Sequence, residues 1–335
     1  MTCILVTGGA GYIGSHTCKA LAGEGFDVVV YDNLSTGHAE FVKWGPLELG
    51  ALQDTDRLRN VIRRHRPDAV IHFAASAYVG ESVTDPGSYY RNNVEGTLSL
   101  LEALRDSGGG AKIVVSSSCA TYGIPERIPI AEDAPQAPIN PYGATKLVME
   151  RMIADFETAH GIGWISLRYF NAAGADPELD VGERHDPETH LIPRVLMALT
   201  GDIPAMEVFG DDYDTPDGTC IRDYIHVTDL ADAHVRAVRR LIDGSPSEAF
   251  NLGTGEGVSV RQILDAAARV VGQEVPHRFA PRRPGDPACL VADATKAGRV
   301  LAWKPRYSAI DDILLTAWDW HCKERNGSAT AAASG

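Results

Sequence analysis

The sequence contains no long uninterrupted apolar run, and none of its segments approaches the ~18 consecutive apolar residues that indicate a membrane-spanning helix. Its first residues include neither a basic region nor a small-residue cleavage site of the secretory kind, so we expect a cytoplasmic protein without membrane contact. Basic residues are also scarce, with 31 against 45 acids and a net charge of −14. Because a nucleic-acid backbone is bound through a dense basic surface, we expect no nucleic-acid partner.

Paired cysteines are absent as well. The six cysteines are widely scattered, and none has the close spacing of a zinc-binding pair. They are Cys3, Cys18, Cys119, Cys220, Cys289 and Cys322. Several lie in apolar surroundings, which favours small buried thiols in a reducing compartment. We therefore predict no metal site, and the sequence shows no internal repeat.

What the sequence does contain is a regular alternation of short β-branched runs and longer segments of helical periodicity. The predicted strands are Cys3–Thr7, Val28–Asp32, Ala69–Ala74, Lys112–Ser117 and Trp164–Tyr169. The predicted helices are Tyr12–Ala22, Asp54–His65, Ser88–Asp106 and Tyr142–His160. Because the strands are continuous apolar runs, we expect both sheet faces to be covered. The alternation predicts an α/β fold with a Rossmann-type, doubly wound parallel sheet.

The composition changes after residue 173. Residues 174–190 are rich in Asp, Glu, Pro and Gly and are predicted to form a long loop. Two helices (Leu191–Thr200 and Asp229–Ile242) and a strand (Ile221–Val227) follow it, and we expect this strand to return to the main sheet. The predicted units are a Rossmann domain (1–173, with a return near 219–253), a smaller, loop-rich C-terminal substrate domain (174–325) and a flexible tail (326–335).

A glycine-rich turn follows the first predicted strand directly. Gly8 permits the tight turn, Gly11 lets the backbone approach a pyrophosphate, and Gly14 lets the helix pack close to the strand. The helix that begins here offers free N–H groups to phosphate oxygens. A strand before the glycines and a helix after them are the context that a dinucleotide site requires.

The second predicted strand ends at Asp32, 18 residues beyond Gly14. A carboxylate there can accept hydrogen bonds from both adenosine ribose hydroxyls, and it would repel a 2′-phosphate. No Arg or Lys lies between Asn33 and His38 to receive such a phosphate. The sequence therefore predicts that residues 1–173 bind NAD rather than NADP.

Tyr142 and Lys146 lie four residues apart on a predicted helix, one turn apart on the same face. Asn140 suits the cap of this helix and Pro141 its first turn. A phenol with a pKa near ~10 is a poor base at neutral pH. A neighbouring ammonium, together with the positive charge of oxidised nicotinamide, favours the phenolate. We predict that Tyr142 and Lys146 are catalytic.

Ser116, Ser117 and Ser118 end the fourth well-marked strand. In a doubly wound sheet this edge faces the ligand crevice, where a hydroxyl can donate to or accept from a sugar oxygen. Serines also terminate strands without any function, and spacing alone does not single out Ser118.

Taken together, these residues resemble the extended short-chain dehydrogenases, and within them the UDP-galactose (UDP-glucose) 4-epimerases. The resemblance extends from Ile4 to about Trp320. The segments that carry it are Val6–His16, Val79–Ser82, Asn92–Val94, Arg168–Asn171, Arg222–Val227 and Arg282–Asp286. The first and fourth mark the superfamily, and the last two point to the epimerases. It implies tightly bound NAD, a UDP-sugar substrate and a homodimer.

The resemblance also implies roles for single residues. Tyr142 would be the acid and base, Lys146 its electrostatic partner and Ser118 the hydroxyl that bridges to the sugar. The residues that would line the NAD are Gly8, Gly11, Tyr12, Ile13, Gly14, Asp32, Asn33, Leu52, Phe73, Ala74, Ala75, Asn93, Ser118, Tyr142, Lys146 and Phe170. Those that would hold the UDP-sugar are Ser118, Tyr142, Asn171, His190, Leu191, Phe209, Arg222, Arg283, Asp286 and Leu290.

Part of the last set has independent physical support. Arg222 and Arg283 carry fork-shaped donors suited to a diphosphate, and a carboxylate such as Asp286 suits ribose hydroxyls. Leu290 falls where relatives vary residue size to admit or exclude an N-acetyl group, which favours unsubstituted hexoses. The sequence departs from the family pattern at Ala51, Ala77, Ala120 and His190.

Three alternatives stay open at this point. One is a nucleotide-sugar 4,6-dehydratase, which needs an acid just after the catalytic hydroxyl, where this chain has Cys119-Ala120-Thr121-Tyr122. A second is 4-epimerisation of another UDP-sugar, such as an N-acetylhexosamine, xylose or glucuronate. The third is a non-catalytic NAD-binding regulator, which would have no need of the Tyr142 and Lys146 pair.

Overall fold

The computed structural model describes residues 2–108, 110, 112–283 and 285–333. Its central feature is a sheet of seven strands, which pair in parallel throughout the described residues. In spatial order the strands are β10 (Glu248–Leu252), β6 (Gly163–Tyr169), β5 (Lys112–Ser118), β4 (Ala69–His72), β1 (Cys3–Thr7), β2 (Asp27–Asp32) and β3 (Leu47–Leu49). The order reverses between β1 and β4, which places a ligand crevice at the carboxyl ends of these strands. The predicted Rossmann-type fold is confirmed.

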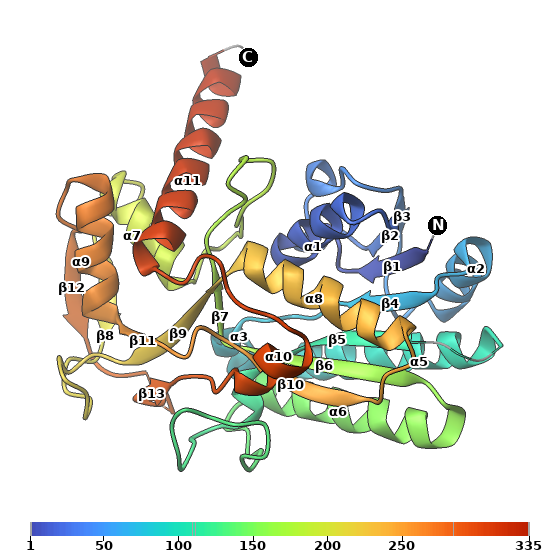
Figure 1. The fold of residues 1–335 in the computed structure, drawn as a ribbon. Helices are drawn as coiled ribbons and strands as arrows, with labels where there is room; N and C mark the ends of the chain where they lie inside the picture. Colours follow the sequence, from blue (N-terminus) through green and yellow to red (C-terminus); the bar gives the residue numbers. More distant parts are fainter. Residues whose placement is uncertain (1, 109, 111, 284, 334–335) are drawn as a thin grey trace.

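Helices cover both faces of this sheet (Figure 1). The helices α1 (Tyr12–Gly23) and α8 (Val227–Ile242) pack together on one face, and α2 (Thr55–His65), α5 (Gly96–Asp106) and α6 (Pro141–His160) lie on the other. Alternate residues of β1 enter the two cores: Ile4 and Val6 pack on the α1 side, and Leu5 packs on the opposite side. This arrangement explains the continuous apolar runs of the strands.

The predicted helix over Ser88–Asp106 is interrupted. The chain forms α3 (Val79–Thr84) and α4 (Pro86–Tyr89), then a π-helical turn over Tyr90–Glu95, and only then α5. Wider turns of this kind often occur at functional sites. This one carries Asn93, and it turns that side chain toward the segment after β4.

The C-terminal unit has small sheets of its own. β9 (Ile221–His226) pairs with β7 (Asn171–Ala173), β11 (Gly257–Ser259) and β13 (Cys289–Leu290), and β8 (Met206–Phe209) pairs with β12 (His277–Ala280). The helices α7 (Leu191–Leu199), α9 (Val260–Val271) and α11 (Ile310–Ala333) enclose a second core. Because β7 follows β6 directly, this unit lies beyond the carboxyl edge of the main sheet (Figure 1). The shorter elements are η1 (Ala39–Phe41), η3 (Cys119–Thr121) and α10 (Thr295–Val300).

The expected return of Ile221–Val227 to the main sheet is wrong. The neighbours of β9 are β7, which directly follows β6, and two strands of the C-terminal unit, so its hydrogen bonds are used outside the main sheet. The chain returns afterwards, through α8, and β10 then pairs with β6 at the edge of the main sheet.

Helix α11 continues to Ala333, through most of the segment predicted as a tail. The division of the chain at residue 173 and the flexibility of residues 326–335 stay predictions. Among the described helices, none has the length and apolar character needed to cross a membrane.

Candidate active site

The glycine-rich turn is shaped by close backbone contacts. Gly8 has φ +75°, and a Cβ added to it would lie 2.6 Å from the amide nitrogen of Ala74. A Cβ on Gly14 would lie 2.2 Å from the carbonyl oxygen of Gly8. A Cβ on Gly11 would meet only that same oxygen, at an ordinary 3.4 Å. Packing within the protein therefore accounts for Gly8 and Gly14, whereas Gly11 leaves room for a ligand.

The start of α1 has free N–H donors beside the space at Gly11. Gly11 occupies the cap position, and no side chain among the described residues caps the helix. The first N–H groups of Tyr12 and Ile13 are therefore available to an anion, with the positive end of the helix dipole behind them. The space at Gly11 and the uncapped helix fit a dinucleotide pyrophosphate.

Asp32 ends β2 next to this turn. Its carboxylate accepts hydrogen bonds from the backbone N–H of Ala10 (3.0 Å) and of Leu34 (2.8 Å). Burial raises its pKa, although these hydrogen bonds oppose the shift. Each oxygen retains a lone pair for a hydroxyl donor. The next residue, Asn33, instead uses its side-chain oxygen to accept from the N–H of Ser35 (3.0 Å).

Other predicted NAD residues lie along the same sheet edge. The carbonyl of Thr7 accepts from the N–H groups of Phe73 (2.9 Å) and Ala74 (3.1 Å), which ties the segment carrying Ala75 to β1. Asn93 is fully buried and bonds Ser76 in both directions, at 2.8 and 3.1 Å. Its amide also donates to the Thr145 hydroxyl at 3.0 Å. Asn93 thus positions the segment after β4 against α6, and its contact with NAD stays a prediction.

Two apolar members of the predicted set complete this edge. Leu52, after β3, is buried against Gly96 at the start of α5. Phe170, directly after β6, is buried in a cluster with Leu290, which the sequence analysis assigned to the sugar side. The structure therefore brings the cofactor and sugar sets into contact at Phe170.

The predicted catalytic residues meet at the ends of β5 and α6. Asn140 caps α6 by accepting from the N–H of Gly143 (2.8 Å), so Tyr142 lies in the first helical turn. Its hydroxyl is hydrogen-bonded with the side chain of Ser118. Lys146 is buried, donates to the carbonyl of Ser116 (2.7 Å) and lies with Nζ 5.9 Å from the centre of the Tyr142 ring.

The protonation equilibria of this set are governed by burial. Burial raises the pKa of Tyr142 to about 12, although its hydrogen bond with Ser118 opposes the shift. Burial lowers the pKa of Lys146 to about 8, and Glu150 opposes this shift. The chain alone therefore keeps Tyr142 protonated at neutral pH. A lower phenol pKa would therefore need a further positive charge, such as the oxidised nicotinamide that the sequence-based expectation combined with Lys146.

A buried ion pair that we did not predict supports the catalytic helix. Glu150, one turn beyond Lys146, pairs with Arg168 of β6 at 2.7 Å, and both side chains are 8% exposed. Arg168 also donates to the hydroxyl of Tyr122 at 2.9 Å. The sequence signal for this pair was Glu150, a charged residue on the apolar face of a predicted helix. The pair fixes α6, and with it Tyr142, against the main sheet.

The predicted nucleotide residues come together in the C-terminal unit. Arg222 on β9 donates to the carboxylate of Asp286, and the guanidinium of Arg283 lies 4.0 Å from the centre of the Phe209 ring. Leu290 on β13 is the register partner of Arg222. Asp286 thus holds Arg222 in place here, whereas the prediction was that the Asp286 carboxylate binds ribose hydroxyls.

The remaining predicted substrate residues lie at the starts of two elements. Asn171 begins β7 and Leu191 begins α7. His190 faces the carboxylates of Glu183 and Glu188. Although burial opposes protonation, these two carboxylates raise the pKa of His190 to about 10.

One of the positions that depart from the family pattern has a visible role. The N–H of Ala120 donates to the hydroxyl of Ser118 at 3.1 Å, which orients the hydroxyl that meets Tyr142. The side chain contributes nothing to this bond, so alanine suffices. Nothing in the structure explains Ala77.

Comparisons with known proteins agree with this geometry. The model of the NAD dependent epimerase/dehydratase family matches residues 4–253. A UDP-glucose 4-epimerase of Rhizobium meliloti is 54% identical over 324 residues, which cover 97% of this chain and 98% of that protein.

Solved structures with bound NAD are also similar to this chain. One is UDP-glucose 4-epimerase from Brucella ovis in complex with NAD, with a TM-score of 0.93 and 55% identity over 95% of this chain and 98% of that one. Another, from Stenotrophomonas maltophila with NAD and formylated UDP-arabinopyranose, has a TM-score of 0.94 and 40% identity over 98% of this chain and 100% of that one.

Proposed function

Because the chain belongs to the NAD dependent epimerase/dehydratase family, we infer that it interconverts UDP-glucose and UDP-galactose by inverting carbon 4 of the sugar. The observation that carries this inference is the meeting of three parts at one sheet edge. They are the open glycine turn with Asp32, the pair of Tyr142 and Ser118 above Lys146, and the arginines of β9 and the segment before β13.

The residues of the chain divide the proton chemistry among them. Tyr142 exchanges a proton with the sugar 4-hydroxyl, and Ser118 bridges these two oxygens. When bound, NAD supplies the hydride acceptor, the hydride donor in its reduced form, and a positive charge near the phenol. Lys146 holds its ammonium beneath Tyr142 through Ser116 and adds to that charge when protonated. Arg222 and Arg283 would hold the diphosphate, which anchors the nucleotide while the 4-keto sugar rotates in the site.

The structure argues against the 4,6-dehydratase alternative. Elimination of a hydroxyl needs an additional acid beside the catalytic serine. The residues that follow Ser118 form η3, Cys119–Thr121, which contains no carboxylate. The next residue, Tyr122, uses its hydroxyl to donate to the side-chain oxygen of Asn251 (2.7 Å).

Replacement of Tyr142 by phenylalanine tests the proposed chemistry. We expect the rate of UDP-galactose epimerisation, followed by NMR of the sugar, to fall by about 10²–10⁴-fold because the proton carrier is lost. NAD content should stay unchanged, since the glycine turn is intact. The control is Tyr90→Phe, on an exposed side chain. A Tyr142→Phe variant with full biological effect would support the non-catalytic regulator instead.

The specific sugar is a separate question, and a panel of UDP-sugars answers it. Leu290 is 8% exposed and packs with Phe170. We propose that this side chain restricts the site to unsubstituted hexoses, so UDP-N-acetylhexosamines should be poor substrates. Leu290→Ala should improve their kcat/KM relative to UDP-galactose, and an unchanged ratio would argue for another restriction. UDP-xylose and UDP-glucuronate complete the panel.

A homodimer and a cytoplasmic location also stay proposals. The exposed apolar side chain of Leu98 (38%) on α5 favours a helix-mediated contact between two copies. Light scattering after size-exclusion chromatography should give twice the mass of one chain. The Leu98→Glu variant should have the mass of a single chain.

A further inference from the structure

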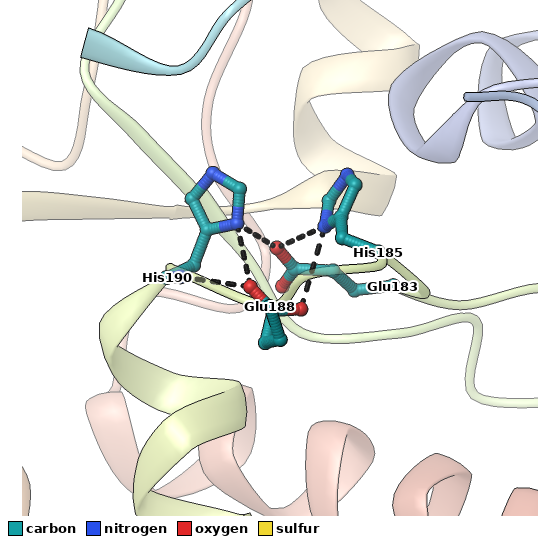
Figure 2. Close-up of side chains that lie close together, drawn as sticks. All are labelled: Glu183, His185, Glu188 and His190. Carbon is teal, nitrogen blue, oxygen red and sulfur yellow. Dashed lines mark hydrogen bonds and ion pairs between the residues drawn. The ribbon is translucent and has the colours of Figure 1, made fainter. Parts of the chain in front are cut away.

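Two histidines and two glutamates gather on the loop before α7. Glu183, His185, Glu188 and His190 lie within eight residues of each other, and we call them the His/Glu cluster. Figure 2 shows both imidazoles with a ring nitrogen turned toward the two carboxylates, which lie below and between them. One possible ligand atom from each residue lies within 4.8 Å of all the others.

The separations within the His/Glu cluster match a tetrahedral site. His190 Nδ1 lies 3.0 Å from Glu183 Oε1 and 2.9 Å from Glu188 Oε1. His185 Nδ1 lies 3.4 Å from Glu183 Oε1 and 3.4 Å from Glu188 Oε2. Zinc bonds of about 2.0–2.2 Å to nitrogen and oxygen imply ligand-to-ligand separations of about 3.3–3.6 Å in a tetrahedron. The four separations lie within a few tenths of an ångström of this range, and Glu188 would turn to offer one of its two oxygens to the ion.

One buried atom of the cluster is only loosely paired. His185 Nδ1 is sealed from solvent, and its ion-pair partners, the carboxylate oxygens of Glu183 and Glu188, both lie 3.4 Å away. A buried polar atom whose partners lie beyond ordinary hydrogen-bond distance is uncommon. A metal ion between Nδ1 and the two carboxylates would provide a closer partner.

A neighbouring acidic cluster shows the contrasting case. Asp176, Glu178 and Asp180 all receive hydrogen bonds from the ammonium of Lys19, at 2.6, 2.8 and 2.8 Å. Their cation is thus a lysine. No described lysine or arginine pairs with the carboxylates of the His/Glu cluster, whose cationic partners are the imidazoles of His185 and His190. Zinc would bind these imidazoles in their neutral form and displace the protons.

One of the carboxylates is already held in place. Glu188 Oε1 accepts hydrogen bonds from the backbone N–H groups of Thr189 and His190, both at 2.7 Å. Metal ligands are commonly fixed by such outer contacts, which reduce the entropy lost when the ion binds. The cluster is therefore partly organised in advance.

We propose that the His/Glu cluster is a binding site for one divalent transition-metal ion, with zinc as the best match to two imidazoles and two carboxylates. Four protein ligands leave no open position, so the ion is structural rather than catalytic. The rings of Tyr12 and Tyr78 lie edge-on to His185, at 6.3 and 5.8 Å. The ion would therefore fix the loop next to the first residue of α1 and the start of α7. Zinc binding at this site does not require the proposed epimerase activity, but His190 also belongs to the predicted UDP-sugar set, so His185 is the residue that distinguishes the two roles.

Zinc binding to the intact protein tests this directly. Protein freed of metal with a chelator is titrated with zinc chloride against a chromophoric competitor, with NAD bound and without thiol reductants. We expect one zinc per chain and a higher Tm, because an ion that binds only the folded state stabilises it. Cobalt in place of zinc should give the visible absorption of a four-coordinate site.

Matched variants separate this site from adventitious binding by the free cysteines. His185→Gln and His190→Gln should each weaken zinc binding at least tenfold, whereas His160→Gln, at an exposed position on α6, should not. Binding of less than one zinc per chain, or equal affinity in all three variants, would overturn the proposal. If either variant fails to fold, the wild-type stoichiometry and cobalt spectrum still decide. Epimerisation is assayed in parallel, so its failure is scored independently.

Discussion

The two halves of the candidate active site are built in different ways. On the sheet side, the geometry comes from backbone segments in close steric contact, such as Gly8 against Ala74 and Gly14 against Gly8. In the C-terminal unit it comes from contacts between charged side chains, such as Arg222 with Asp286. The first half is rigid and sterically closed, whereas the second depends on single charged contacts.

This difference has a mechanistic consequence. In the proposed reaction Tyr142 would need a fixed position beside the reacting carbon, which favours rigid surroundings. The 4-keto sugar would rotate in the site while the nucleotide remains anchored. A few directional contacts at the diphosphate are suited to that task, because they restrain one end of the substrate alone. We therefore expect large effects of substitution on the sheet side and smaller, binding-specific effects in the C-terminal unit.

The largest loss of stability should follow replacement of Glu150 by glutamine. This change leaves the Arg168 guanidinium buried without its carboxylate, which costs about 3–5 kcal/mol. Urea unfolding measures the effect, and Asp155→Asn, an exposed position on the same helix, is the control. A loss of stability under about 1 kcal/mol would mean that the position of α6 does not depend on this pair and that the sheet side is less rigid than proposed.

A second test of steric closure uses two glycines of α1. Gly14→Ala places a methyl group 2.2 Å from the Gly8 carbonyl, so the turn must move. We expect a cost of about 3 kcal/mol and at least tenfold weaker NAD binding, measured by calorimetry. A Cβ at Gly23, in the last turn, meets no atom within 4 Å. Gly23→Ala should therefore be as stable as the wild type or more stable by up to about 1 kcal/mol. Equal changes in stability for Gly14→Ala and Gly23→Ala would contradict the proposed steric closure at Gly14.

The response to acid offers a third test, because buried histidines on the sheet side have no carboxylate partner. Burial lowers the pKa of His72 to about 3, with a further contribution from Lys146. Its two nitrogens are bonded to Thr7 (2.7 Å) and Thr97 (3.0 Å). Below pH 6.5 the unfolded chain binds the proton and the folded chain does not, so this stability is present above pH 6.5 and is lost as pH falls toward 3.

The variant His72→Gln isolates this contribution. Between pH 7 and pH 5 the wild type should lose about 2 kcal/mol more than the variant in unfolding free energy. His160→Gln, at an exposed position, should keep the wild-type loss. Urea unfolding at both pH values measures the difference. If the losses are the same in wild type and His72→Gln, then His72 is not neutral in the folded protein.

The same contrast explains what could be predicted from the sequence. The glycine turn, Asp32, Tyr142 and Lys146 are encoded by spacing within single strand–helix units, so their geometry follows from local rules. The pairing of Arg222 with Asp286, the burial of Glu150 with Arg168 and the edge position of β10 depend on contacts across the fold. The three-residue strand β3 and the π-helical turn around Asn93 are too short to leave a periodic signal. The His/Glu cluster is local, but its spacing matches no common metal motif.

The smallest effect should come from Arg222, and it tests the other side of the comparison. Arg222→Leu removes the proposed donor to the diphosphate, far from carbon 4, so ground state and transition state should lose the same contact. We expect KM for UDP-galactose to rise about tenfold, or about 1.4 kcal/mol, with kcat within about threefold of wild type. Arg222→Lys should recover only part of the loss. The lysine keeps the positive charge, but its ammonium lacks the fork-shaped donors that also bind Asp286. Arg278→Leu, on an exposed ion pair of β12, is the matched control. A fall in kcat equal to the fall in kcat/KM would place Arg222 in the reacting geometry and would remove the distinction between an anchored and a reacting half.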